Sequence, residues 1–135
     1  MEKFYYKKIL VGFRVKTLPE GSVPLTDSKE PLQVLALCHK KNGHRVAAHF
    51  HTPSKRISNH LQECLIVKKG RIKISLYGPD HKYFKSIQLK KGELFILLCG
   101  GYGVDFLEDS EVFELKNGPF KNDKVIIKDA KQSVV

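Results

Sequence analysis

Apolar and polar residues alternate with a period of two along most of the chain, and no segment keeps the 3.6-residue apolar period of an amphipathic helix. The stretch 71–77 alternates strictly, as expected of a strand with one buried face. Further strand-like runs are predicted at 8–15, 32–39, 44–51, 61–67, 83–89, 93–98, 104–107, 111–115 and 125–127. Short strands at this spacing predict an all-β sandwich or barrel with very little helix.

Turn residues separate these strands. Asn42-Gly43 favours a two-residue hairpin turn, because both positions of that turn adopt positive φ. Segment 18–31 contains proline, serine and acidic residues, and it predicts a long loop. We therefore predict one domain over residues 1–135, with its core at about 32–128 and a loose tail at 129–135.

The composition favours a soluble, cytoplasmic protein without a membrane partner. Apolar residues make up 41% of the chain, but the longest apolar run is 94–99, far short of the ~20 residues that a membrane span needs. Three cysteines, Cys38, Cys64 and Cys99, are too few and too widely spaced for a disulfide framework or a zinc knuckle. They are expected to be small buried thiols.

The net charge of +10 allows a polyanionic or a small anionic partner. Three lysine pairs, at 40–41, 68–69 and 90–91, stand beside predicted turns, where lysines keep strand edges soluble and unpaired. A nucleic-acid-binding β-barrel is the least favoured alternative, because the aromatic residues do not cluster with the lysines along one strand. We expect a small polar or anionic ligand and no nucleic acid.

His49 and His51 form the most suggestive chemical motif. Histidines at positions i and i+2 of a strand project from the same face and can converge on one ion or substrate. Glu63, at the start of the next strand, would complete a set of two histidines and one carboxylate, which leaves open positions on a metal.

The wider spacing resembles the cupin superfamily. Gly43, His49-x-His51, Glu63 and Gly70 resemble its first signature, and the stretch 92–102 resembles its second. The resemblance covers about residues 44–124. It implies a single antiparallel jelly-roll β-barrel, open at one end, with the histidines pointing inward. The resemblance also implies a homodimer, because such proteins commonly form one. For the cofactor, it supports one bound divalent transition metal (Fe, Mn, Ni or Zn) and no bound metal equally.

Two departures from the cupin pattern change the expected chemistry. Eleven residues, 52–62, separate His51 from Glu63, and this insertion would form a lip over the site. Tyr102 stands where the family carries its last metal-binding histidine. A histidine and a tyrosine across a pocket form an acid/base pair, and some cupins related to sugar-nucleotide epimerases and ketoisomerases look like this. They also resemble this chain in a glutamine-containing strand, and the resemblance implies that its glutamine, here Gln62, is a ligand-binding residue.

We therefore expect a protein that acts on a carbohydrate or nucleotide-linked sugar, as a metal-assisted enzyme or as an acid/base isomerase or epimerase. His49 or His51 is the expected base. Tyr102 is the expected proton donor or orienting hydroxyl, with a pKa that charges in the pocket can lower. Arg56 in the insertion would bind an anionic group, unless it is a solvated loop residue. A non-catalytic cupin that only binds a small ligand is the alternative.

Overall fold

A computed structural model describes residues 1–127, so the predicted tail at 129–135 lies outside the described residues. Its strands are β1 (Glu2–Tyr6), β2 (Ile9–Val15), β3 (Gly21–Pro24), β4 (Leu35–Cys38), β5 (Glu63–Lys69), β6 (Arg71–Tyr77), β7 (Tyr83–Lys90), β8 (Leu94–Leu97), β9 (Gly101–Phe106) and β10 (Glu111–Lys116). The all-β prediction is confirmed for this range, which contains no helix. No helix in residues 1–127 is therefore long and apolar enough to cross a membrane.

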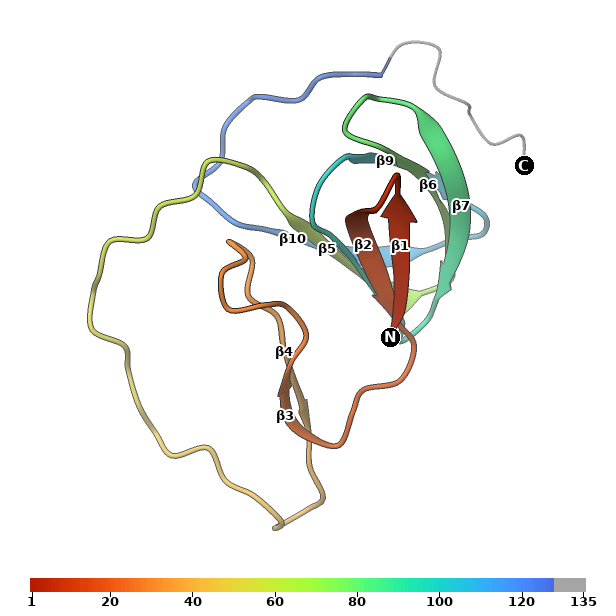
Figure 1. Ribbon diagram of the computed structural model, residues 1–135. Coiled ribbons are helices and arrows are strands. Elements are labelled where there is room, and N and C mark those ends of the chain that lie inside the picture. The colour runs from red at the N-terminus through yellow and green to blue at the C-terminus, as the bar shows by residue number, and fades with distance from the viewer. Residues whose placement is uncertain (128–135) are drawn as a thin grey trace.

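Two antiparallel sheets face each other around the main core (Figure 1). One sheet has the strand order β1-β2-β8-β5-β10, and the other has the order β7-β6-β9. Alternate residues of β5, β6 and β8 point into the space between the sheets, where Leu65, Ile74 and Phe95 are buried. The hairpin of β3 and β4 covers part of the outer face of the larger sheet, over Phe13 and Ile96.

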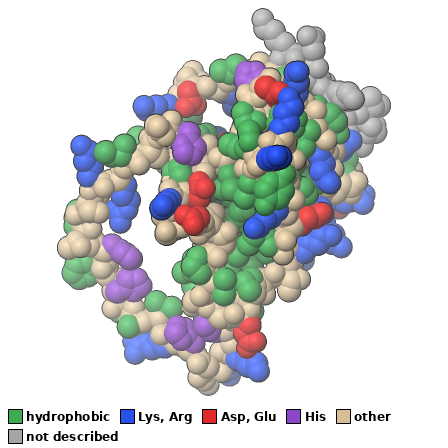
Figure 2. All heavy atoms as spheres, in the orientation of Figure 1, with side chains coloured by type: hydrophobic (Ala, Val, Ile, Leu, Met, Phe, Trp, Pro, Cys, Tyr) green, Lys and Arg blue, Asp and Glu red, His purple; other side chains and the backbone are tan. Residues whose placement is uncertain are grey.

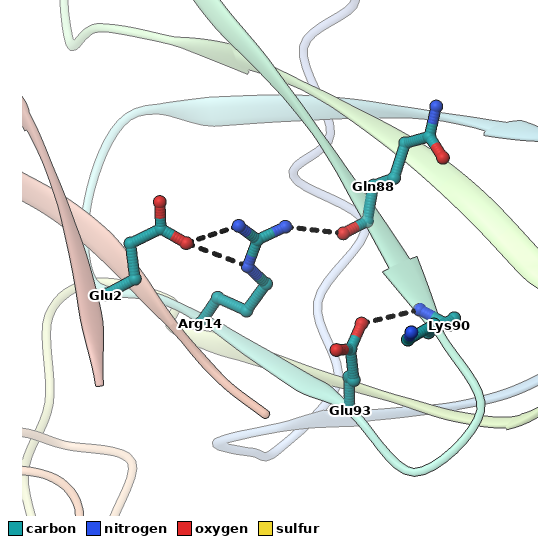
Figure 3. A network of polar contacts seen from close by, with 5 residues as sticks. All are labelled: Glu2, Arg14, Gln88, Lys90 and Glu93. Atoms are coloured by element: carbon teal, nitrogen blue, oxygen red, sulfur yellow. Dashed lines mark hydrogen bonds and ion pairs between the residues drawn. The ribbon is translucent and has the colours of Figure 1, made fainter. Parts of the chain in front are cut away.

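Arg14 joins the two sheets on the side of β1 and β7 (Figure 3). Its guanidinium is held by the Glu2 carboxylate, with 3.0 Å between Nε and Oε1, and it donates to the Gln88 carbonyl oxygen of β7 at 2.7 Å. The hydrogen bonds from Arg14 lower the pKa of Glu2. Next to this contact, the buried Glu93 carboxylate accepts the backbone N–H of Lys90 at 2.9 Å. This side of the sandwich is closed.

The opposite side of the sandwich is open. Within the described residues, β9 pairs only with β6 and β10 pairs only with β5, so both are edge strands. The short connection at 107–110 joins them. The two sheets therefore do not close into a barrel here, and this open side exposes inward-facing residues of β9 and β10 to solvent.

Several predicted strands differ from the structure. Residues 44–51 form no strand, although Asn42 has a φ of 60° and the N–H of Gly43 donates to the Lys40 carbonyl at 3.0 Å, as in a tight turn. The predicted hairpin is wrong because no second strand pairs with these residues. Residues 125–127 also form no strand, whereas β1 and β3 were not predicted. Segment 18–31 is therefore only partly a loop.

The turn between β1 and β2 carries a conformational cost that a single substitution should reduce. Lys7 and Lys8 both have positive φ, at 47° and 68°, a region that costs a side chain about 1 kcal/mol or more. We expect Lys8→Gly to raise the free energy of unfolding by about 0.5–1 kcal/mol in urea denaturation. Lys3→Gly, in the exposed part of β1, is the control and should lower it.

Candidate functional site

Four chemically active side chains meet at the open side of the sandwich. They are Tyr102 of β9, Glu63 of β5, and Glu114 and Lys116 of β10, and we call them the tyrosine–carboxylate cluster. None of the four lies next to another in the sequence. The antiparallel pairing of β5 with β10, together with the packing of β9 across the sandwich, brings them together.

Strand alternation explains why these side chains point inward. Glu63 shares the inner face of β5 with the buried Leu65 and Val67. Lys116 lies opposite Glu63 in the β5–β10 register, and Glu114 lies opposite Leu65, so all of them face the other sheet. The ring of Tyr102 packs edge-on against Phe95 with 6.5 Å between the ring centroids.

Polar contacts hold the tyrosine–carboxylate cluster together. The Tyr102 hydroxyl donates to Glu114 Oε1 at 2.9 Å. Lys116 Nζ lies 3.5 Å from a carboxylate oxygen of Glu63 and 3.5 Å from one of Glu114. The Glu63 side chain is only 12% exposed, whereas that of Glu114 is 44% exposed. Glu63 is thus the inner carboxylate and Glu114 the outer one.

The environment fixes the protonation states of the tyrosine and the lysine. Burial raises the pKa of Tyr102, and the hydrogen bonds and charges of Glu63 and Glu114 raise it further. Desolvation opposes the charge on Lys116, but the two carboxylates outweigh it and raise the pKa of Lys116. At neutral pH the cluster therefore contains a neutral phenol and an ammonium group.

The raised pKa corrects an expectation from the sequence. Charges in the pocket were expected to lower the pKa of Tyr102, but the neighbouring charges are carboxylates, which disfavour a phenolate. The Tyr102 proton lies in the hydrogen bond to Glu114, so the phenol oxygen can accept a hydrogen bond from a ligand hydroxyl. This geometry supports the orienting role of Tyr102 over that of proton donor.

The structure does not place His49 and His51 in this cluster. Both lie in a segment without regular structure, residues 39–61, in which every residue is exposed; we call it the arm. The two imidazole rings are near each other, with centroids 5.2 Å apart and planes at 74°. His49 Nδ1 lies 2.7 Å from the Ala47 carbonyl oxygen. Figure 1 shows that the arm bows away from the two sheets.

Arg56 and Gln62 occupy very different surroundings. Arg56 is an exposed arm residue, and within residues 1–127 it forms no hydrogen bond or ion pair. Gln62 is completely buried and points to the outer face of the larger sheet, away from Glu63. Its side chain accepts the Leu32 N–H at 3.0 Å and donates to the Leu98 carbonyl at 3.2 Å and to the Glu30 carboxylate.

The described residues do not form the metal-ligand set suggested by the sequence. No group of three or more His, Cys, Asp or Glu side chains within residues 1–127 has the arrangement of a metal site. Glu63 is paired with Lys116 and is not brought to His49 and His51. Because the residues as placed do not fit a metal, we assign no chemical step to one.

Glu114 and Lys116 are the members of the cluster that sequence reasoning missed. The alternation in 111–116 places Val112, Glu114 and Lys116 on one face, and charged residues on a strand normally face solvent. Only the pairing with β5 shows that this face looks toward the opposite sheet. Once the register is known, a lysine and two glutamates on an otherwise apolar inner face indicate a candidate binding site.

The cysteines give a separate test of how the larger sheet is packed. Burial raises the pKa of Cys64 to about 11, whereas Cys38 is partly exposed. We expect iodoacetamide at pH 8 to alkylate Cys38 in the folded protein and Cys64 only after unfolding, because the thiolate is the nucleophile. Peptide mass spectrometry with and without urea measures this. Equal labelling of both thiols without urea would contradict the packing around β5.

No protein-family model, curated protein or solved structure matches this chain.

Proposed function

We propose that the chain binds a compact polar ligand, a carbohydrate or a nucleotide-linked sugar, at the open side of the sandwich and moves a proton on it. The tyrosine–carboxylate cluster carries this proposal, because Tyr102 is oriented by Glu114 toward a partly buried site with charged neighbours. Carboxylates and a phenol oxygen accept hydrogen bonds from sugar hydroxyls, and Lys116 donates them. The resemblance to cupins supports a jelly-roll frame for this site.

In the proposed reaction, His49 or His51 removes a proton from the carbon next to a ligand carbonyl. The C–H electron pair moves into the new C–C double bond, and the carbonyl oxygen receives the negative charge. Return of a proton to the same carbon from the opposite face regenerates the carbonyl and completes an epimerisation. Where that carbon carries a hydroxyl, the charged oxygen takes up a proton to give an enediol; protonation of the former carbonyl carbon and loss of the hydroxyl proton then form the new carbonyl and complete an isomerisation. Imidazole suits this role because its ordinary pKa of ~6.5 leaves it largely neutral at pH 7. Tyr102 positions the ligand, and Lys116 stabilises the charge on oxygen.

A non-catalytic binding protein is the second candidate. Two observations favour it. The tyrosine–carboxylate cluster, as described, contains no histidine. In addition, the raised pKa of Tyr102 makes its phenol a poor source of protons. In this case the cluster and the arm still bind the ligand, but no bond to carbon breaks.

Solvent deuterium distinguishes the two candidates. The protein is incubated in deuterated water with a panel of nucleotide-linked keto sugars, and mass spectrometry reads deuterium at carbon. Incorporation that is lost in His51→Asn supports the enzyme, and Lys68→Gln, at the exposed end of β5, is the control. Ligand binding without incorporation supports the binding protein. Absence of both binding and incorporation across the panel would refute the proposed function.

A further inference from the structure

The arm, residues 39–61, is strongly basic and contains no Asp or Glu. It holds five of the six histidines and five other basic residues, which are Lys40, Lys41, Arg45, Lys55 and Arg56. These five Lys and Arg residues supply half of the net charge of +10. Every residue of the arm is exposed, and Figure 2 shows its Lys, Arg and His side chains spaced along it. A segment of this charge attracts a polyanion.

Planar rings lie between the cations of the arm. Arg45 and Lys55 stand five positions before and after Phe50, whose side chain is 90% exposed. The rings of His39 and His44 stack on each other, with 4.4 Å between their centroids and 18° between their planes. Bases of a single-stranded nucleic acid stack on such rings, while Lys and Arg side chains bind the phosphates between them.

The backbone of the arm distinguishes a nucleic acid from a membrane. The arm forms no strand or helix, so its exposed backbone N–H and C=O groups are solvated. The hydrocarbon of a bilayer cannot hydrogen-bond such groups, whereas phosphates, sugars and bases can. A nucleic acid is therefore favoured, although Phe50 and Ile57 are exposed apolar side chains. A single strand fits better than a duplex, in which the bases are already stacked on one another.

The arm is held at both ends and lies apart from the sandwich between them. Before it, β4 pairs with β3, and after it Asn117 donates to Ser58 Oγ at 2.9 Å and to the His60 carbonyl at 3.1 Å. Between these contacts the arm bows away from the two sheets (Figure 1). A polyanion that binds along the arm therefore leaves the strand pairing of the sandwich unchanged.

We propose that the arm binds single-stranded nucleic acid, RNA or DNA, without sequence preference. Its Lys and Arg side chains bind phosphates, and the rings of Phe50, His39 and His44 stack on bases. Aromatic rings and lysines do not cluster along one strand, which disfavours nucleic acid at the level of the sequence, but the arm combines both outside the strands. This binding goes beyond the proposed function, which concerns a small ligand at the open side of the sandwich.

Fluorescence anisotropy of the full chain with labelled oligo(dT) and oligo(U) of about 15 nucleotides, near the largest single-site size, tests the proposal. Five phosphate contacts predict that log K falls with log[salt] with a slope of about −3.5. In Lys55→Gln/Arg56→Gln the slope should become about −2, and the affinity at ~50 mM salt should fall at least tenfold. Lys90→Gln/Lys91→Gln, at the exposed end of β7, removes the same charge and should retain the parent slope.

Phe50→Leu tests stacking separately from charge. The substitution keeps an apolar side chain and removes the planar ring, so it should weaken binding to oligo(dT) about tenfold. Because this side chain is 90% exposed, the free energy of unfolding should not change. Ile57→Leu, also in the arm and 81% exposed, is the matched control and should bind as tightly as the parent protein.

Three results would overturn the inference. The first is absence of oligonucleotide binding at ~50 mM salt, where phosphate contacts are strongest. The second is an equal loss of affinity in the two double variants, which would place the binding outside the arm. The third is tighter binding to vesicles of anionic phospholipid that persists in Phe50→Leu, which would identify a membrane surface as the partner. None of these results depends on deuterium incorporation, so failure of the proposed function would leave this inference intact.

Discussion

Tyr102→Phe should reduce solvent deuterium incorporation about 100-fold while leaving the protein folded. The substitution removes one oxygen, which orients the ligand through the hydrogen bond to Glu114. Misplacement of a reacting group by about 1 Å costs a rate factor of this size. The ring of Tyr102 packs against Phe95, and phenylalanine keeps this contact. Initial rates of incorporation at saturating ligand measure the effect.

Two companion variants separate an orienting role of Tyr102 from proton donation. Glu114→Gln keeps a hydrogen-bond acceptor for the phenol and removes a charge that raises the pKa of Tyr102. If Tyr102 orients the ligand, this variant should stay within about threefold of the parent rate, because the amide oxygen still holds the hydroxyl. A rate that rises about tenfold or more in Glu114→Gln would contradict the orienting role and favour proton donation.

Gln62→Leu should lower the free energy of unfolding by about 3 kcal/mol or more. The side chain is fully buried, and leucine of similar size leaves the Leu32 N–H, the Leu98 carbonyl and the Glu30 carboxylate without this partner. Each buried polar group that loses its partner costs about 1–3 kcal/mol. Since domains of this size are stable by only about 5–15 kcal/mol, the variant should unfold at a markedly lower urea concentration.

Gln88→Leu is the matched control for this prediction. Gln88 is an exposed residue of β7, and its contact with Arg14 uses the backbone carbonyl, which the substitution leaves in place. Its effect should stay within about 0.5 kcal/mol. A Gln62→Leu variant as stable as Gln88→Leu would show that the polar contacts of Gln62 do not hold the start of β5 in place.

Strands with strict alternation were the easiest part of the fold to predict. The stretch 71–77 matches β6 residue for residue, because one buried face imposes the period of two whatever its partner is. Residues 44–51 were also predicted as a strand, although Ala47 and Ala48 interrupt their alternation, and they form no strand in the structure, since a strand also needs a neighbour with free backbone groups beside it. Pattern alone does not reveal whether that neighbour is available.

The site was predictable only in part, for a related reason. Glu63 and Tyr102 were singled out from the spacing of glycines and aligned signatures, and the structure places both at one site. Gln62 was selected as a ligand-binding residue, but one step along a strand reverses the face to which a side chain points. Glu114 and Lys116 become inward-facing through the register with β5, which is a long-range property.

The two long sides of the sandwich are held together by different contacts between the sheets. On one long side the Arg14 guanidinium donates to the Gln88 carbonyl of the other sheet, whereas on the side of β9 and β10 the sheets are joined by the hydrogen bond from Tyr102 to Glu114 and by the connection at 107–110. Separation of β9 from β10 would break the hydrogen bond between Tyr102 and Glu114, whereas the contact of Arg14 with β7 on the other side would stay in place. A ligand that enters between these two strands therefore competes with the Tyr102–Glu114 hydrogen bond, so its size is limited by the spacing of β9 and β10.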